Sequence, residues 1–149
     1  MSGFQTNLLT GLAVALQTQG LGTWAPSGVY TTDQTGIVLF NTPQAPNRII
    51  TLSTYPVSDH PSLSDSVIGL QVRTRWGGQD PRYVIDLDDS IFTYIHGKTN
   101  WTVGSGASAV VIVQCLSQSA ISLGQDENGR WMFSHNYYLT LWRPSTNRT

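Results

Sequence analysis

The residues best placed for chemistry lie in one loop, within the stretch TLSTYPVSDHPSLSDSVIGLQVRTR (residues 51–75). This loop separates two strand-like runs and contains Asp59, His60 and Asp65. An imidazole beside carboxylates is a combination that general acid–base catalysis uses. The same polar residues also suit a connector between strands, or the contact surface of an assembly. From these residues alone, all three alternatives remain open.

The other clustered titratable residues favour structural roles. His96 is expected at the end of a helix, where the helix dipole favours positive charge. His135 is expected on the aromatic face of a strand, as a hydrogen-bonded sheet histidine. The acidic cluster Asp86, Asp88 and Asp89 is expected on an exposed helix face near the helix start, where negative charge is favoured. We therefore interpret the cluster as a solvated surface rather than as paired acid–base carboxylates.

The motifs that usually mark an enzyme or a metal site are missing from the sequence. No histidine pair has metal-ligand spacing, and no G-x-S-x-G, Walker or G-x-G-x-x-G motif is present. DENG (residues 126–129) resembles the start of a calcium loop, but the closing Glu does not follow, so a turn is expected. The single cysteine, Cys115, lies in an apolar run and is expected to be a buried, inert thiol. The sequence thus predicts no enzyme, cofactor or metal.

Composition favours one weakly charged domain covering residues 1–149. Charged residues make up 11% of the chain, against about 25% in typical proteins. The net charge of −1 offers no electrostatic surface for nucleic acid. So few charges also weaken repulsion between copies, which favours assembly. The N-terminus lacks the pattern of a secretory signal, and no apolar run approaches the length of about 20 residues that spans a bilayer. We expect a soluble protein that is intracellular when made.

The loop must be held by a sheet with two helices. The first helix is predicted from apolar residues at helical spacing and ends near Gly20; they are Leu9, Leu12, Ala13 and Leu16. Residues 21–36 form an irregular excursion rich in Gly, Pro and Thr. The second helix starts at Asp80 and Pro81 and ends before Gly97.

Strands account for the remaining patterned segments, at residues 36–40, 48–55, 66–75, 107–119 and 130–143. In the third of these, Gln71, Arg73 and Arg75 are expected to share the outer face. The fourth is apolar on both faces and is expected to be a central strand covered on both sides. The order is α-β-β-β-α-β-β, which predicts an α+β fold with a mixed or antiparallel sheet and two helices packed on it.

From Asn7 to Thr149 the chain resembles the tail terminator (minor capsid) proteins of long-tailed actinobacterial phages. The likeness runs through NLLTGLAVAL, TGIVLFNTPQAPNRIITLSTYPVSD and DPRYVIDLDDSIFTYIHG. Its most specific parts are YPVSD with the following LSDSVIGLQVRTR strand, and the closing NYYLTLWRPSTNRT. Their order and spacing together carry the resemblance.

The resemblance implies a structural virion protein without a cofactor. Such a subunit forms a ring, generally hexameric, on the head-proximal end of the tail tube, stops tube polymerisation and docks the tail to the head connector. The expected partners are other copies of the chain, the tail tube protein and head–tail connector proteins. No membrane and no sequence-specific nucleic acid binding are expected, although DNA can pass through the ring. The expected location is the virion, at the head–tail interface, after assembly in the cytoplasm of the bacterial host.

In such a ring, the polar loop becomes a contact surface. The expected interface residues lie in the loop, on the outer face of the next strand and at the last hairpin tip (residues 121–129); they are Tyr55, Pro56, Asp59, His60, Asp65, Arg73, Arg75, Leu123, Gln125, Asp126 and Glu127. Arg73 or Arg75 can pair with Asp126 or Glu127 of a neighbour, or can simply face solvent. Two alternative functions remain: a head-completion protein at the portal side, and a small monomeric ligand-binding domain built around the loop.

Overall fold

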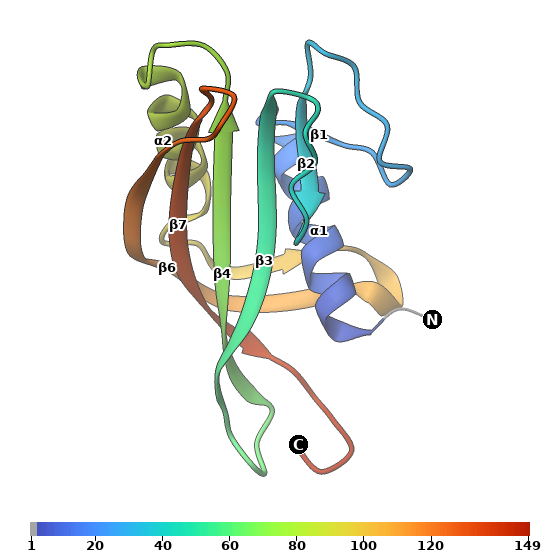
Figure 1. Ribbon diagram of the computed structural model, residues 1–149. Helices are drawn as coiled ribbons and strands as arrows, with labels where there is room; N and C mark the ends of the chain where they lie inside the picture. The colour runs from blue at the N-terminus through green and yellow to red at the C-terminus, as the bar shows by residue number, and fades with distance from the viewer. Residues whose placement is uncertain (1–2) are drawn as a thin grey trace.

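The computed structural model describes residues 3–149 and has the predicted α+β fold (Figure 1). The helices are α1 (Phe4–Thr18) and α2 (Arg82–Ile95), and a short 3-10 helix covers Gly106–Ser108. The strands are β1 (Thr23–Trp24), β2 (Thr35–Leu39), β3 (Arg48–Asp59), β4 (Asp65–Trp76), β5 (Thr99–Val103), β6 (Val110–Gln125) and β7 (Trp131–Trp142).

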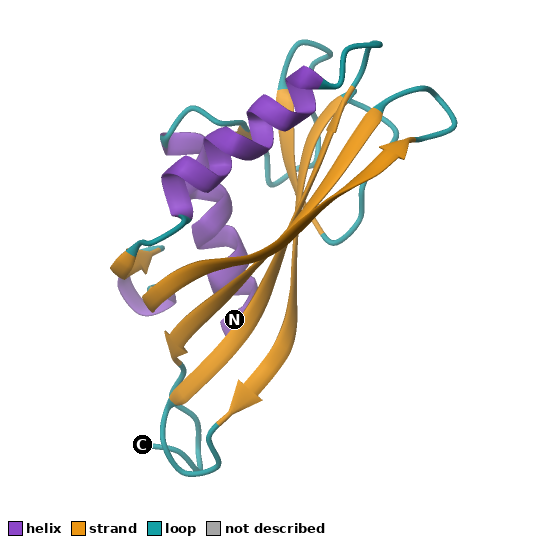
Figure 2. Ribbon diagram, turned by 90° about the vertical axis from the view of Figure 1, so that its left-hand side faces the viewer, coloured by secondary structure: helices purple, strands orange, loops and turns teal. Residues whose placement is uncertain are grey.

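The strands form one mixed sheet in the order β1-β2-β3-β4-β7-β6-β5. The β1–β2 and β2–β3 pairs are parallel, and all other pairs are antiparallel. Both helices lie on the same side of the sheet, with α1 against β3, β5 and β6 and α2 against β4 and β7 (Figure 2). The predicted mixed sheet with two packed helices is thereby confirmed. Neither helix has the combination of length and hydropathy that would let it cross a membrane.

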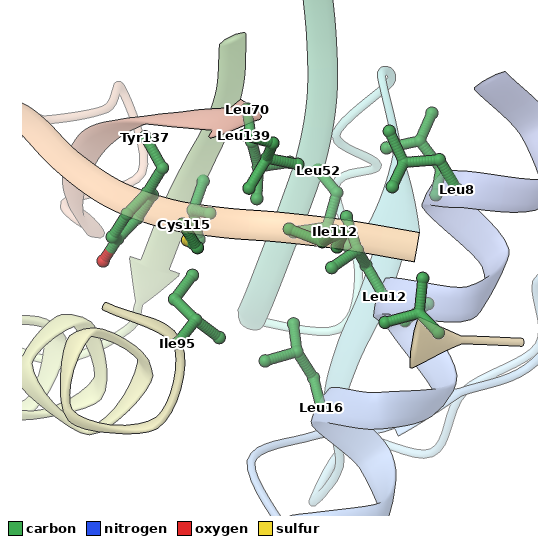
Figure 3. Packing of buried hydrophobic residues seen from close by; sticks show 14 of the residues in the cluster. Leu8, Leu12, Leu16, Leu52, Leu70, Ile95, Ile112, Cys115, Tyr137 and Leu139 are labelled. Atoms are coloured by element: carbon green, nitrogen blue, oxygen red, sulfur yellow. The ribbon is translucent and has the colours of Figure 1, made fainter. Parts of the chain in front are cut away.

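Each helix forms where an apolar stripe meets the sheet. The α1 side chains Leu8, Leu12 and Leu16 are buried and point toward Leu52 of β3 and Ile112 of β6 (Figure 3). Their spacing of four residues keeps them on one side of the helix. The stripe of α2 is buried in the same way and consists of Val84, Leu87, Asp88, Ile91 and Ile95.

The ends of α2 are those that the sequence predicts. Asp80 accepts the backbone N–H of Arg82 at 2.9 Å and so satisfies one of the unpaired groups at the helix start. Gly97, which follows the helix, has a φ of 84°, a left-handed conformation that glycine adopts without steric cost.

The two faces of the sheet differ in what covers them. Ile68, Leu70 and Val72 of β4 join the core under the helices. The alternate residues of β4, such as Gly69 and Arg73, lie on the other face, which no helix within residues 3–149 covers. We call it the open face. The loop that precedes β3 covers only one end of it, where Thr42 and Thr51 share a side-chain hydrogen bond of 2.7 Å.

The main departure from the predicted fold concerns β6. We predicted a central strand covered on both sides, but β6 lies next to the edge strand β5 and its outward side chains are exposed. The short strand β5, which the sequence did not indicate, pairs with β6 only as far as Gln114. Within residues 3–149 no strand pairs with that edge of β6 from Gln118 to Gln125. The prediction was wrong because apolar residues on both faces do not by themselves reveal what covers them.

The predicted excursion of residues 21–36 is largely irregular, and hydrogen bonds connect it to α1 and β2. It contains the two-residue strand β1, which the sequence did not indicate. The backbone N–H of Trp24 donates to the side-chain oxygen of Gln17 in α1 at 2.8 Å. The hydroxyl of Tyr30 donates to the carbonyl of Ile37 in β2. These contacts hold the excursion against the β1 edge of the sheet.

Candidate assembly surfaces

The loop between β3 and β4 is shorter and more ordered than predicted. β3 continues to Asp59, so only residues 60–64 form a loop, which we call the β3–β4 tip. The Nδ1 atom of His60 accepts the backbone N–H groups of Ser62 and Leu63, at 3.1 and 2.9 Å. A ring nitrogen that accepts two N–H groups carries no hydrogen of its own. His60 therefore fixes the shape of the tip.

Asp59 is engaged on the opposite side of the same hairpin. Its carboxylate accepts the hydroxyl of Ser66 at 2.6 Å and forms an ion pair of 3.2 Å with Arg148. The Ser66 hydrogen bond, aided by the charge of Arg148, lowers the pKa of Asp59. Among residues 3–149, the side chains of Asp59, His60 and Asp65 share no hydrogen bond. A hollow of about 400 Å³ borders all three, but the Asp59 carboxylate is already bound by Ser66 and Arg148, and the His60 Nδ1 by the backbone of the tip.

The C-terminal residues complete this end of the molecule. The backbone N–H of Ser64 donates to the carbonyl of Thr149 at 2.8 Å, and the N–H of Thr149 donates to Ser62 at 3.0 Å. The N–H of Arg143 donates to the carbonyl of Ser64 at 2.8 Å. The β3–β4 tip and residues 143–149 thus form one hydrogen-bonded surface at the lower end of Figure 1.

The opposite end of the sheet is organised by Arg130, in the turn of residues 126–130 between β6 and β7. Its side chain is 6% exposed, and its guanidinium forms an ion pair of 2.8 Å with Asp126 and donates to the side-chain oxygen of Gln44 at 2.8 Å. Asp126 also accepts two backbone N–H groups of its own turn. Because β6 continues to Gln125, the predicted tip of residues 121–129 is only this turn.

Arg75 does not lie on the solvent-facing surface that we predicted for it. It is 5% exposed, and its guanidinium donates to three carbonyls of the loop before β3: Asn47 at 3.1 Å, Pro46 at 2.7 Å and Gln44 at 3.3 Å. Burial, with Arg130 nearby, lowers the pKa of Arg75. Arg75 is on the predicted face of β4, but the irregular loop covers that end of it.

These contacts reduce the number of charged residues that could form the predicted ion pair between neighbouring subunits. Asp126 is held within its own chain, and Arg75 is buried. Glu127 is exposed and Arg73 is partly exposed, and neither side chain has a hydrogen bond or an ion pair within residues 3–149. Of the four charges, these two remain available to a partner.

An apolar row crosses the middle of the open face. Tyr55 of β3 lies over Gly69 of β4, where an added Cβ would overlap the tyrosine ring. The next residues across the sheet are Tyr138 of β7 and Leu116 of β6. Tyr55, Tyr138 and Leu116 are 37, 36 and 37% exposed. Burial against the sheet, with Tyr138 nearby, raises the pKa of Tyr55.

The unpaired half of β6 (residues 118–125) extends this surface to the edge of the sheet. Ile121 is 63% exposed and Leu123 is 40% exposed. Gln125 is exposed at the end of the strand, where its amide donates to the carbonyl of Gly129 at 3.0 Å. An exposed apolar edge with unpaired backbone groups is a ready template for another chain.

The family model of the bacteriophage tail terminator protein matches residues 15–143. The match starts within α1 and includes α2 and every strand of the sheet. The chain belongs to the bacteriophage tail terminator family. A search of curated proteins finds no match. Members of this family are structural proteins of the phage tail rather than enzymes, so the protein is a component of the virion.

In this tail terminator, the predicted contact residues do not form one site. Tyr55, Pro56, Asp59, His60 and Asp65 lie toward the β3–β4 tip, whereas Leu123, Gln125, Asp126 and Glu127 lie toward the opposite end. The strand β4 runs between these ends over 12 residues, which corresponds to about 35 Å. The two groups of residues are therefore suited to contacts with different neighbours.

The tail terminator also contains a buried polar chain that we did not predict. Asp88 of α2 is buried, not on the exposed helix face. Its carboxylate lies 3.0 Å from Nδ1 of His135 in β7, and Nε2 of His135 lies 2.7 Å from the hydroxyl of Ser117 in β6. The predicted hydrogen-bonded role of His135 is confirmed. His96 is not explained by the helix dipole as we expected, because its Nδ1 accepts the backbone N–H of Ser117 at 2.9 Å.

Proposed function

We propose that the protein assembles into a closed hexameric ring that caps the head-proximal end of the tail tube. The ring stops tube polymerisation and provides the docking surface for the head connector. The supporting observation is that the two edges of the sheet differ: one ends in the two-residue strand β1, the other in β5 and the unpaired half of β6. A ring built by head-to-tail contacts needs two different, complementary surfaces on each subunit.

The open face supports the same assembly. Tyr55, Tyr138 and Leu116 form an apolar row that leads to Ile121 at the unpaired half of β6. Tyrosines and apolar side chains are enriched where subunits meet. In the proposed ring, a neighbouring subunit covers this row, and Arg73 makes a polar contact at its margin.

The two ends of the sheet make the axial contacts in this proposal. The β3–β4 tip with residues 143–149 forms one end, and the turn of residues 126–130 forms the other, about 35 Å away. One end meets the tail tube protein and the other meets the connector, so DNA passes through the ring. The ring assembles in the cytoplasm of the host. The YPVSD and RPSTNRT segments favour a long-tailed phage of an actinobacterium.

Native mass spectrometry and electron microscopy of the full chain, alone and with purified tail tubes, test this proposal. We expect a closed multimer, or a ring at one end of each tube with elongation stopped. Ile121→Glu should weaken assembly, because it places a charge on the unpaired half of β6. Val29→Glu is the matched control, since Val29 is 75% exposed but lies in the excursion.

Two results would overturn the proposal. If Ile121→Glu assembles like the unaltered protein, the unpaired half of β6 is not part of the ring contact. If the protein ignores tubes and binds only the isolated connector, it acts as a head-completion protein at the portal side.

A further inference from the structure

The chain from Asp88 through His135 to Ser117 fixes the tautomer of the imidazole. Asp88 lies 3.1 and 3.0 Å from Nδ1 through its two oxygens, and an ionised carboxylate can only accept a hydrogen bond. Nδ1 therefore carries the ring hydrogen. The lone pair of Nε2 is then directed at the Ser117 hydroxyl, 2.7 Å away. The hydroxyl donates to a nitrogen that can take its proton.

Packing holds the imidazole in this orientation. The side chains of His135 and Asp88 are each 7% exposed. The His135 ring stacks on Tyr137, with centroids 4.4 Å apart and planes inclined by 12°, and on Phe92 at 5.9 Å. Ser117, in contrast, is partly exposed. The base is thus buried and fixed, while the serine that it contacts is only partly buried.

We propose that Ser117 is an activated nucleophile that accepts an acyl or phosphonyl group from small activated donors, with His135 as its general base and Asp88 as a positioning residue. The inference is independent of ring assembly. In the acyl case, the Ser117 oxygen bonds to the ester carbonyl carbon while its proton passes to Nε2 of His135. The bond between the carbonyl carbon and the leaving oxygen then breaks, and the leaving group takes the proton from His135. The products are an ester on Ser117 and a free alcohol or phenol.

One contact limits the acyl and phosphonyl compounds that can react to activated ones. In serine proteases of the chymotrypsin type, the backbone N–H of the nucleophile helps to stabilise the oxyanion. Here the N–H of Ser117 donates to His96 at 2.9 Å and is already occupied. Loss of one oxyanion donor costs about 100- to 1,000-fold in rate. Ser117 should therefore react once with fluorophosphonates or nitrophenyl esters and should not turn over ordinary esters.

The experiment is fluorophosphonate labelling of the full chain, with the modified residue located by peptide mass spectrometry. The matched control is Ser119 on the same strand, whose hydroxyl accepts the amide of Asn136 at 3.3 Å and has no histidine partner. General-base assistance is worth about 100-fold or more. We expect Ser117 to be labelled at least about 100 times faster than Ser119, and Ser117→Ala to lose this label.

Two further variants separate chemistry from folding. His135→Gln should reduce labelling of Ser117 to the rate of Ser119. Should that variant unfold, His96→Ala leaves the buried pair intact. Because it removes the acceptor of the Ser117 N–H, it should accelerate labelling. Labelling of Ser117 no faster than that of Ser119 overturns the proposal, as does an unchanged rate in a folded His135→Gln or no acceleration in His96→Ala.

The role of Asp88 is tested by the pH dependence of labelling. The rate should fall in acid, because a protonated imidazole cannot accept the serine proton. Two titratable groups contact the imidazole directly, Asp88 of α2 and Tyr137 of β7. Three others lie one contact further away: Asp89 and Cys115 near Tyr137, and His96 at the N–H of Ser117. Asp88→Asn should change the pH profile of labelling as well as its rate. A lower rate with the same profile would show that Asp88 acts only through the fold.

Discussion

Replacing Gly11 by alanine tests how closely α1 packs on β5. In a helix interior, alanine is about 1 kcal/mol more favourable than glycine. At Gly11, however, a Cβ would lie 2.9 Å from Cγ2 of Val103, 3.0 Å from its Cβ and 3.0 Å from the backbone nitrogen of Gly104. Overpacking of this kind costs about 1–3 kcal/mol. A backbone nitrogen cannot rotate away, so we expect a net loss of about 1 kcal/mol in the free energy of unfolding.

Thermal unfolding followed by circular dichroism measures this loss. For a chain of 149 residues, 1 kcal/mol corresponds to a fall in Tm of about 3 °C. Val103→Ala removes Cγ2, the nearest of the three obstructing atoms. Gly11→Ala should therefore cost less in that background, with a coupling of about 0.5–1 kcal/mol in the double-mutant cycle. A rise in Tm for Gly11→Ala, as helix propensity alone predicts, would refute the close packing of α1 on β5.

Three further outcomes follow from the surfaces. Arg75→Ala should lower the free energy of unfolding by about 2–4 kcal/mol, because three loop carbonyls lose a charged hydrogen-bond donor. Urea unfolding measures this loss. A loss under about 0.5 kcal/mol would contradict the role of Arg75 in holding the loop before β3. The pKa of Asp59 is lowered by Ser66 and Arg148, so its contribution to stability is present above the unfolded pKa of about 3.9 and is lost as pH falls through the lower folded pKa. Melts from pH 2 to 6 should show a deficit for Asp59→Asn that vanishes in acid, whereas a deficit at every pH would point to lost packing. Arg73→Glu should leave monomer stability within about 0.5 kcal/mol yet weaken the ring, and unchanged assembly by native mass spectrometry would exclude Arg73 from the contact.

The sequence predicted the elements whose apolar residues repeat at a clear period. The stripe of α1, the stripe of α2 and the alternation of β4 all have such a period, and each is found at its predicted place. Gly97 marked the end of α2 because its left-handed φ favours glycine. Periodicity does not reveal strands as short as β1 and β5, because a strand of two to five residues contains too few alternations.

Asp88 was misplaced although the helical period contained the signal. Asp88 follows Val84 by four residues and precedes Ile91 by three, which places it on the buried stripe. Asp86 and Asp89 fall off the stripe and are exposed. Grouping the three aspartates by their adjacency in the sequence hid this difference. The inward-facing position of His135 on β7 supplied the partner that a carboxylate on the stripe requires.

Arg75 could not be placed from the pattern of β4 alone. The alternation puts Arg73 and Arg75 on the same face, and the structure agrees. Arg75 is nevertheless buried because its end of the face is covered by the loop before β3, which has no periodic signal. A buried guanidinium needs several acceptors, and only the folded loop brings three carbonyls to it.

The misinterpretation of β6 has a physical cause that returns to the assembly. A strand with apolar residues on both faces is usually covered on both faces, because moving apolar surface out of water is favourable. The predicted strand covered residues 107–119, and of its apolar residues Val113 and Leu116 remain 43 and 37% exposed in the single subunit. The pattern and the structure agree once a neighbouring subunit covers this side, as in the proposed ring. The proposed ring would thus cover the exposed apolar residues of β6, and Ile121→Glu tests this contact.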